Sequence, residues 1–191
     1  NDEAWSPADG AERLFYTALA NVIASIGFAA VLLALMSQTQ LQGWTSSSLG
    51  KGVVWGLAGY IAFFVAPAIG LPPEIPGIEA APLENRQGWW LLTVALFVVG
   101  IGLLAFAPLK LKVISLVFFA VPYIVGAPHG HGPEFLGDAE TVAALKALHS
   151  QFIMATGFTN LVFWLVLGVF SAWCIKRWVL KGASDHAVAH G

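Results

Sequence analysis

The sequence has few charged side chains for its length. Asp, Glu, Lys and Arg together make up 10% of the 191 residues, whereas 58% are hydrophobic and the mean hydropathy is +0.75. A water-soluble domain carries about 25% charged residues. The chain therefore has too little polar surface for water as its solvent, and its composition favours an integral membrane protein.

Cysteine pairs, basic runs and nucleotide motifs are also lacking. The one cysteine, Cys174, stands in an apolar stretch, which excludes a disulfide framework and a paired-cysteine metal or redox site. The formal net charge of −2 and the lack of a Lys/Arg-rich run argue against nucleic acid as a partner. Gly50-Lys51-Gly52 lacks the flanking residues of a phosphate-binding loop. No His or carboxylate lies near a serine within the long apolar stretches of the sequence, so we expect no enzymatic activity.

The sequence does contain five long apolar stretches. A helix needs roughly 20 mostly apolar residues to cross the hydrocarbon core. We therefore predict an all-α, polytopic transmembrane helix bundle, with a single transmembrane domain over residues 1–191. The five expected spans are 14–36, 53–71, 89–108, 111–125 and 152–175. A tight, basic turn at Pro108 predicts that the third and fourth spans form an antiparallel hairpin.

The distribution of Lys and Arg over the expected loops predicts an orientation. The positive-inside rule counts basic residues near the helix ends, and the richer side faces the cytoplasm. One side of the chain holds six basic residues, and the other holds only Arg13, Arg86 and Lys146. We therefore expect a cytoplasmic tail over 176–191 and two acidic outer loops, 72–88 and 126–151, with a short helix over 138–149 in the second.

Tryptophans at the expected span ends agree with this orientation. Trp89 and Trp90 open the third span at the outer boundary, and Trp55, Trp173 and Trp178 lie near the inner one. An indole ring has an apolar body and a polar N–H group, so it prefers the membrane–water interface. We therefore expect these side chains to form aromatic belts.

The two outer loops contain the candidate metal ligands. In the second loop, His129, His131 and Glu134 lie close together in sequence and His149 follows, while Glu74 lies in a proline-rich turn of the first loop. Imidazole and carboxylate are ligands that Co²⁺, Ni²⁺ and Zn²⁺ accept. Two solvated loop histidines, and a solvated acid in a turn shaped by prolines, would explain the same residues without a metal.

The spans themselves offer little chemistry. Apart from Lys112 at the edge of the fourth span, they contain no Asp, Glu, Lys, Arg or His, although such groups usually mark ion paths through a membrane. Asn21 and Asn160 are polar residues that we expect to form hydrogen bonds between helices. Small residues allow close helix packing, which we expect at Gly52, Gly56, Gly59, Gly100 and Gly102.

Several strings, in order along nearly the whole chain, resemble one family, the predicted cobalt transporter subunit CbtA. Its most specific element here is Gly70-Leu71-Pro72-Pro73-Glu74-Ile75-Pro76-Gly77. The other strings are Trp5-Ser6-Pro7-Ala8-Asp9-Gly10, Glu12-Arg13, Trp55-Gly56-Leu57-Ala58-Gly59, Arg86-Gln87, Trp89-Trp90, Gly126-Ala127-Pro128-His129 and Phe163-Trp164-Leu165-Val166-Leu167-Gly168. By this resemblance the family motif residues are Asp9, Arg13, Pro72, Pro73, Glu74, Pro76, Gly77, Pro128 and His129.

The resemblance implies a membrane subunit of a cobalt uptake system in a bacterial cytoplasmic membrane. Co²⁺ would be a substrate captured by the outer loops and passed inward, with no covalently bound cofactor. The implied partners are lipid and a small, single-helix, histidine-bearing CbtB-type subunit, or further copies of the chain. Family members usually carry another hydrophobic segment upstream of the first string, which we would expect here also. A non-catalytic accessory subunit of a larger complex remains the alternative.

Overall fold

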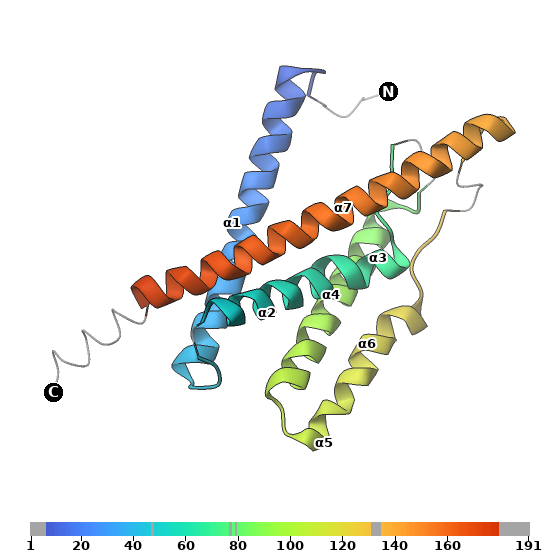
Figure 1. Cartoon of the computed structure of the whole chain (residues 1–191). Coiled ribbons are helices and arrows are strands. Elements are labelled where there is room, and N and C mark those ends of the chain that lie inside the picture. Colours follow the sequence, from blue (N-terminus) through green and yellow to red (C-terminus); the bar gives the residue numbers. More distant parts are fainter. Residues whose placement is uncertain (1–6, 47, 77, 79, 131–134, 180–191) are drawn as a thin grey trace, which may run out of the picture. The chain divides into compact units, whose positions relative to one another are not determined.

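The computed structural model describes residues 7–46, 48–76, 78, 80–130 and 135–179, and within these ranges the regular structure is entirely helical (Figure 1). This confirms the predicted all-α class. The chain divides into two compact units, one with residues 1–52 and 169–191 and the other with residues 53–168. Two of the helices contribute to both units.

The first unit is built on α1 (Ala11–Leu41), which packs against the π-helical turn η2 (Ile175–Val179). Leu32, Met36 and Thr39 recur at helical spacing on the buried face of α1, and Ile175 is fully buried. The helix ends where Gly43 adopts a positive φ of 72°, a conformation that glycine reaches without steric cost. The chain then turns back so that the Trp44 N–H donates to the Thr39 carbonyl at 2.9 Å.

The second unit begins with a helix that changes its winding halfway along. This helix comprises α2 (Leu49–Tyr60), the π-helical turn η1 (Ile61–Val65) and α3 (Ala66–Gly70). Pro67 has no N–H group, and in a regular α-helix its ring would clash with the carbonyl four residues earlier. The wider π turn directly before it, in which the Ala66 N–H donates to the Ile61 carbonyl, relieves that conflict.

Glycines let α2 approach α7 (Ala139–Cys174) closely. A methyl group at Gly59 would lie 2.2 Å from Cε3 of Trp164, and one at Gly56 would lie 2.5 Å from the Trp164 carbonyl oxygen. Phe63 packs on the same indole with ring centroids 5.1 Å apart. Close packing is thus confirmed at these two glycines. It is wrong for Gly102, where an added methyl group would meet nothing within 4 Å.

The predicted antiparallel hairpin is present. It consists of α4 (Leu83–Phe106), the four-residue α5 (Leu109–Lys112) and α6 (Ile114–Val125), and α4 and α6 lie side by side (Figure 1). Gly100 is a close-packing position here as well, since a methyl group would lie 2.5 Å from the Phe119 ring. At 12 residues, α6 is about 18 Å long and falls short of the roughly 30 Å hydrocarbon core.

In the part of the chain that the structure describes, four helices are long and apolar enough to cross a membrane: Ala11–Leu41, Leu49–Gly70, Leu83–Phe106 and Ala139–Val179. The second outer loop is shorter than predicted, because the expected helix over 138–149 and the last span form one continuous helix from Ala139. No glycine or proline lies between Gly137 and Gly157 to interrupt it. The first outer loop is also shorter, since α4 already begins at Leu83.

The contact between Gly59 and Trp164 makes a direct prediction. Gly59→Ala should destabilise the protein by about 1–3 kcal/mol, because the buried indole cannot move away without strain. Unfolding in detergent, followed by circular dichroism, measures this loss. Gly102→Ala is the matched control and should be neutral or slightly stabilising, since alanine is the better helix former. Equal stability of the two variants would contradict the packing argument.

Candidate functional site

The segment between α3 and α4 forms the centre of the candidate site. Pro72, Pro73 and Pro76 give it an extended, non-helical backbone, because each proline fixes its own φ and restricts the residue before it. Ile75 and Ala81 are buried and anchor the segment to the second unit. The prolines and the two buried residues therefore fix the conformation of this proline-rich turn.

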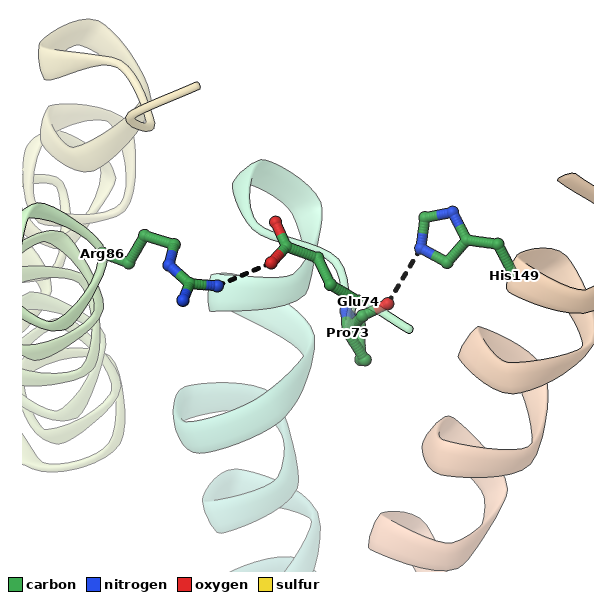
Figure 2. A network of polar contacts seen from close by, with 4 residues as sticks. All are labelled: Pro73, Glu74, Arg86 and His149. Carbon is green, nitrogen blue, oxygen red and sulfur yellow. Dashed lines mark hydrogen bonds and ion pairs between the residues drawn. The ribbon is translucent and has the colours of Figure 1, made fainter. Parts of the chain in front are cut away.

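Glu74 is bound by an arginine of the following helix. Its Oε2 accepts a hydrogen bond from Nη1 of Arg86 at 2.6 Å, and the two side chains are 26% and 31% exposed (Figure 2). Arg86 lies in the first turns of α4, so the ion pair joins the loop to that helix. The Glu74 carboxylate is thus partly buried, and the Arg86 guanidinium balances its charge.

His149 holds the other side of the same loop. Its Nε2 lies 2.9 Å from the Pro73 carbonyl oxygen, and the ring packs against Phe135 with centroids 5.8 Å apart (Figure 2). A carbonyl only accepts hydrogen bonds, so Nε2 carries the proton in this contact and is not available to a metal ion. The structure thus places His149 against the residue directly before Glu74, where it anchors the backbone of the loop.

Two further hydrogen bonds tie the surrounding helix ends together. Nε1 of Trp89 donates to the Pro122 carbonyl at 3.1 Å, and the Tyr123 hydroxyl donates to the Ala66 carbonyl at 2.8 Å. Trp89 is 5% exposed and packs on Gly70, where an added methyl group would lie 2.5 Å from its ring. The expectation of an aromatic belt is therefore wrong for Trp89, which packs inside the protein.

A pocket of about 580 Å³ opens beside the ion pair. Its polar lining consists of Glu74, Arg86 and Gln87. The remaining lining residues are apolar: Leu71, Pro72, Pro73, Ile75, Pro76, Ile78, Ala80, Leu83 and Trp90. A pocket that is mostly apolar, with a few converging polar groups, is the usual form of a small-ligand site. Its charged groups are one carboxylate and one guanidinium.

The predicted metal ligands do not converge on one point in the part of the chain that the structure describes. Within residues 7–46, 48–76, 78, 80–130 and 135–179, no three or more His, Cys, Asp or Glu side chains could hold one metal ion. Glu74, His129 and His149 therefore form no such group, and His129 is exposed. His131, Glu134 and the motif residue Gly77 lie outside the described residues.

The other singled-out polar residues have local roles. Asp9, just before α1, and Arg13, in its first turn, form an exposed ion pair at 2.7 Å. The amide of Asn160 donates to the Thr156 carbonyl of its own helix at 3.0 Å, so the expected bond between helices is not the one formed. Asn21 is exposed, and its backbone carbonyl accepts from the Ser25 hydroxyl at 2.7 Å.

Arg86 is the functional residue that sequence reasoning missed. In the sequence, Arg86 stands out only as one of three basic residues on the acidic side of the chain and as part of the family string Arg86-Gln87. That rarity was itself a signal, because an isolated cation among many acids is expected to find a carboxylate partner. Glu74 and Arg86 are twelve positions apart, and no regular spacing between them identifies the pair from the sequence.

A family model described as "Probable cobalt transporter subunit (CbtA)" matches residues 1–176 of the chain. No curated protein and no solved structure matches the sequence. The match covers the whole second unit and most of the first, and it includes the proline-rich turn, Arg86 and the pocket beside them.

Asp138 caps the long helix α7 and gives a pH prediction. Its Oδ1 accepts from the Thr141 N–H at 2.8 Å, and hydrogen bonds from the Thr141 side chain and backbone hold the pKa of the carboxyl below its ordinary 3.8. A lowered pKa means that the cap is present above pH 3.8 and is lost as the pH falls further through the folded value.

We therefore expect amide exchange at Thr141 to lose its protection below pH 3.8, and Asp138→Ala to lose it at neutral pH. Hydrogen exchange normalised to the intrinsic rate measures both effects. Asp138→Asn is the matched control, because asparagine caps helices without titrating. Protection that changes equally with pH in Asp138→Asn would show that another group is responsible.

Proposed function

Since this chain belongs to the CbtA family of probable cobalt transporter subunits, we propose that it passes Co²⁺ inward across a bacterial cytoplasmic membrane. The observation that carries this proposal is Glu74, a carboxylate at the wall of the pocket of about 580 Å³, beside the ends of membrane-spanning helices. In this role Glu74 is the first anionic group that the entering ion meets.

The chemistry of the pocket suits the first capture of a divalent ion. Carboxylate oxygen is an accepted ligand of Co²⁺, and the amide of Gln87 adds a second oxygen in the lining. The prolines hold the loop in one conformation, so less ordering entropy is lost when the ion binds. Because Nε2 of His149 is bonded to the backbone, we assign His149 to loop positioning.

The direction of transport follows from the proposed orientation. With the acidic loops on the periplasmic or external face and the tail 176–191 in the cytoplasm, the ion enters from the outer side. Each charge that moves inward gains about 2.3 kcal/mol per 100 mV of membrane potential, so a divalent ion gains about twice that. The potential alone therefore favours entry.

Further metal ligands are needed to carry the ion across the membrane. The apolar stretches of its spans carry no ionisable side chain that could hand the ion onward. We propose that a small, histidine-bearing CbtB-type subunit, or further copies of this chain, supply the missing ligands. His129, His131 and Glu134 remain candidate ligands for the same assembly.

A second candidate function is an accessory subunit that supports a larger complex. Two observations favour it: Glu74 is already paired with Arg86, and His149 is already bonded to the Pro73 carbonyl. In this view both residues serve the fold of the outer loop, and another subunit binds the metal.

Uptake of Co²⁺ into proteoliposomes separates the two functions. We expect uptake by the chain together with its partner subunit, and a fall of about tenfold or more in Glu74→Gln, which removes the charge and keeps the shape. Glu84→Gln is the matched control: Glu84 is an exposed acid of α4 outside the pocket lining, and its loss should leave uptake unchanged.

Two results would contradict the transport proposal. Uptake that stays at the level of empty liposomes in every combination of subunits would leave the accessory function. An effect of Glu74→Gln no larger than that of Glu84→Gln would show that Glu74 does not capture the ion.

A further inference from the structure

The ion pair between Glu74 and Arg86 differs from the other ion pair in the described part of the chain. Arg13, in the first turn of α1, pairs with Asp9 just before that helix, and their side chains are 61% and 86% exposed. Glu74 and Arg86 join a loop to a helix, are 26% and 31% exposed, and both line the pocket. Their pairing therefore determines which charge the pocket presents.

The pairing is also incomplete. Arg86 contacts the carboxylate through Nη1, while its Nε is buried and has no hydrogen-bond acceptor. The strongest arginine–carboxylate pairs use two parallel hydrogen bonds, and a buried donor without an acceptor carries a free-energy cost. The guanidinium thus holds Glu74 less firmly than an arginine can, and the carboxylate is correspondingly easier to release.

We propose that Arg86 is a tethered competitor for the metal ion, which occupies the Glu74 carboxylate when no ion is bound and must be displaced before one binds. This inference rests on the proposed function, in which Glu74 captures the ion. A guanidinium and a divalent cation repel each other at one carboxylate. Arginine does not lose its proton, so the competitor leaves only by moving away.

A competitor of this kind serves both capture and release. A divalent ion attracts the carboxylate more strongly than a singly charged guanidinium does, whereas Na⁺ and K⁺ gain no such advantage. Ion passage also requires binding that is weak enough to let the ion leave. When the ion moves on, Arg86 returns to Glu74 and lowers the chance of rebinding from the same side. Arg86 is therefore a residue that sets affinity.

The loop can lose Arg86 without losing its position. On the far side from Arg86, the Pro73 carbonyl is bonded to His149 of α7 (Figure 2). The backbone that carries Glu74 is thus held by its own prolines and by a second helix. For this reason we expect variants of Arg86 to keep their fold.

Calorimetric titration of the full chain in nanodiscs with Co²⁺ tests the proposal. Arg86→Gln should bind Co²⁺ with a Kd about three- to tenfold lower than wild type, because the competing charge is removed. Arg86→Lys keeps the charge and should bind like wild type. Lys110→Gln, at an exposed position on α5, is the control for loss of one positive charge elsewhere and should also bind like wild type.

The outcomes separate this inference from the proposed function. If wild type binds Co²⁺ and Glu74→Gln does not, Glu74 captures the ion; a Kd of Arg86→Gln equal to or higher than wild type then overturns the competitor role and leaves Arg86 as a loop anchor. If wild type binds no Co²⁺, or Glu74→Gln binds it equally well, both proposals are overturned together.

A second measurement uses the wild-type chain, so it tests the proposal even when the Arg86→Gln protein does not fold. The sequence has three arginines, Arg13, Arg86 and Arg177, so the Nε–H resonance of Arg86 can be assigned by nuclear magnetic resonance. Zn²⁺ serves as a diamagnetic stand-in. Its addition should shift this resonance and speed its exchange with water, and a resonance that does not change at saturating Zn²⁺ would overturn the proposal.

Discussion

Three backbone carbonyls at the ends of neighbouring segments accept side-chain donors from other helices, and one end of the second unit depends on these bonds. His149 of α7 bonds to Pro73, Tyr123 of α6 to Ala66, and Trp89 of α4 to Pro122. Carbonyls near helix ends lack the intrahelical partners of those in the middle, and a membrane offers no water to replace them. Side chains from distant parts of the sequence donate to these carbonyls, in addition to the Gly126 N–H that also donates to Pro122, and the bond from His149 fixes the loop that carries Glu74.

Close packing between the helices provides the stabilisation that the hydrophobic effect does not provide inside a membrane. Lipid tails are as apolar as the side chains they would contact, so helices in a membrane associate mainly through tight packing. Gly56 and Gly59 let the backbone of α2 reach Trp164, and Gly100 does the same for Phe119 across the hairpin. The π turn before Pro67 is part of this arrangement, because it places Phe63 on the same indole as Gly59. Prolines and glycines weaken helices in water, but in this protein they determine where and how closely the helices pack.

Features that depend on local sequence were predictable, and those that depend on pairing over long distances were not. Apolar length identified the spanning helices, and the short turn at Pro108 identified the hairpin of α4 and α6. The contact of His149 with Pro73 joins residues 76 positions apart, and no periodicity in the sequence encodes it. Trp89 looked like a residue of the membrane boundary because its position at a span end is typical of such residues, but packing against Gly70 and a carbonyl acceptor place it inside. The continuity of α7 was missed because His149-Ser150-Gln151 is polar, although polarity alone does not end a helix.

Charge balance limits what one chain can do with a divalent ion. The Glu74–Arg86 pair is neutral before the ion arrives, so an ion added to this pair brings two uncompensated positive charges into a mostly apolar pocket. Such charge at the edge of a medium of low dielectric constant is unfavourable unless further ligands neutralise it. The described residues contain no group of three or more His, Cys, Asp or Glu side chains that could do so. Under the proposed function, capture by Glu74 is therefore a weak first step in which water completes the coordination. Movement inward then depends on anionic or imidazole groups that come from residues 131–134 or from another subunit.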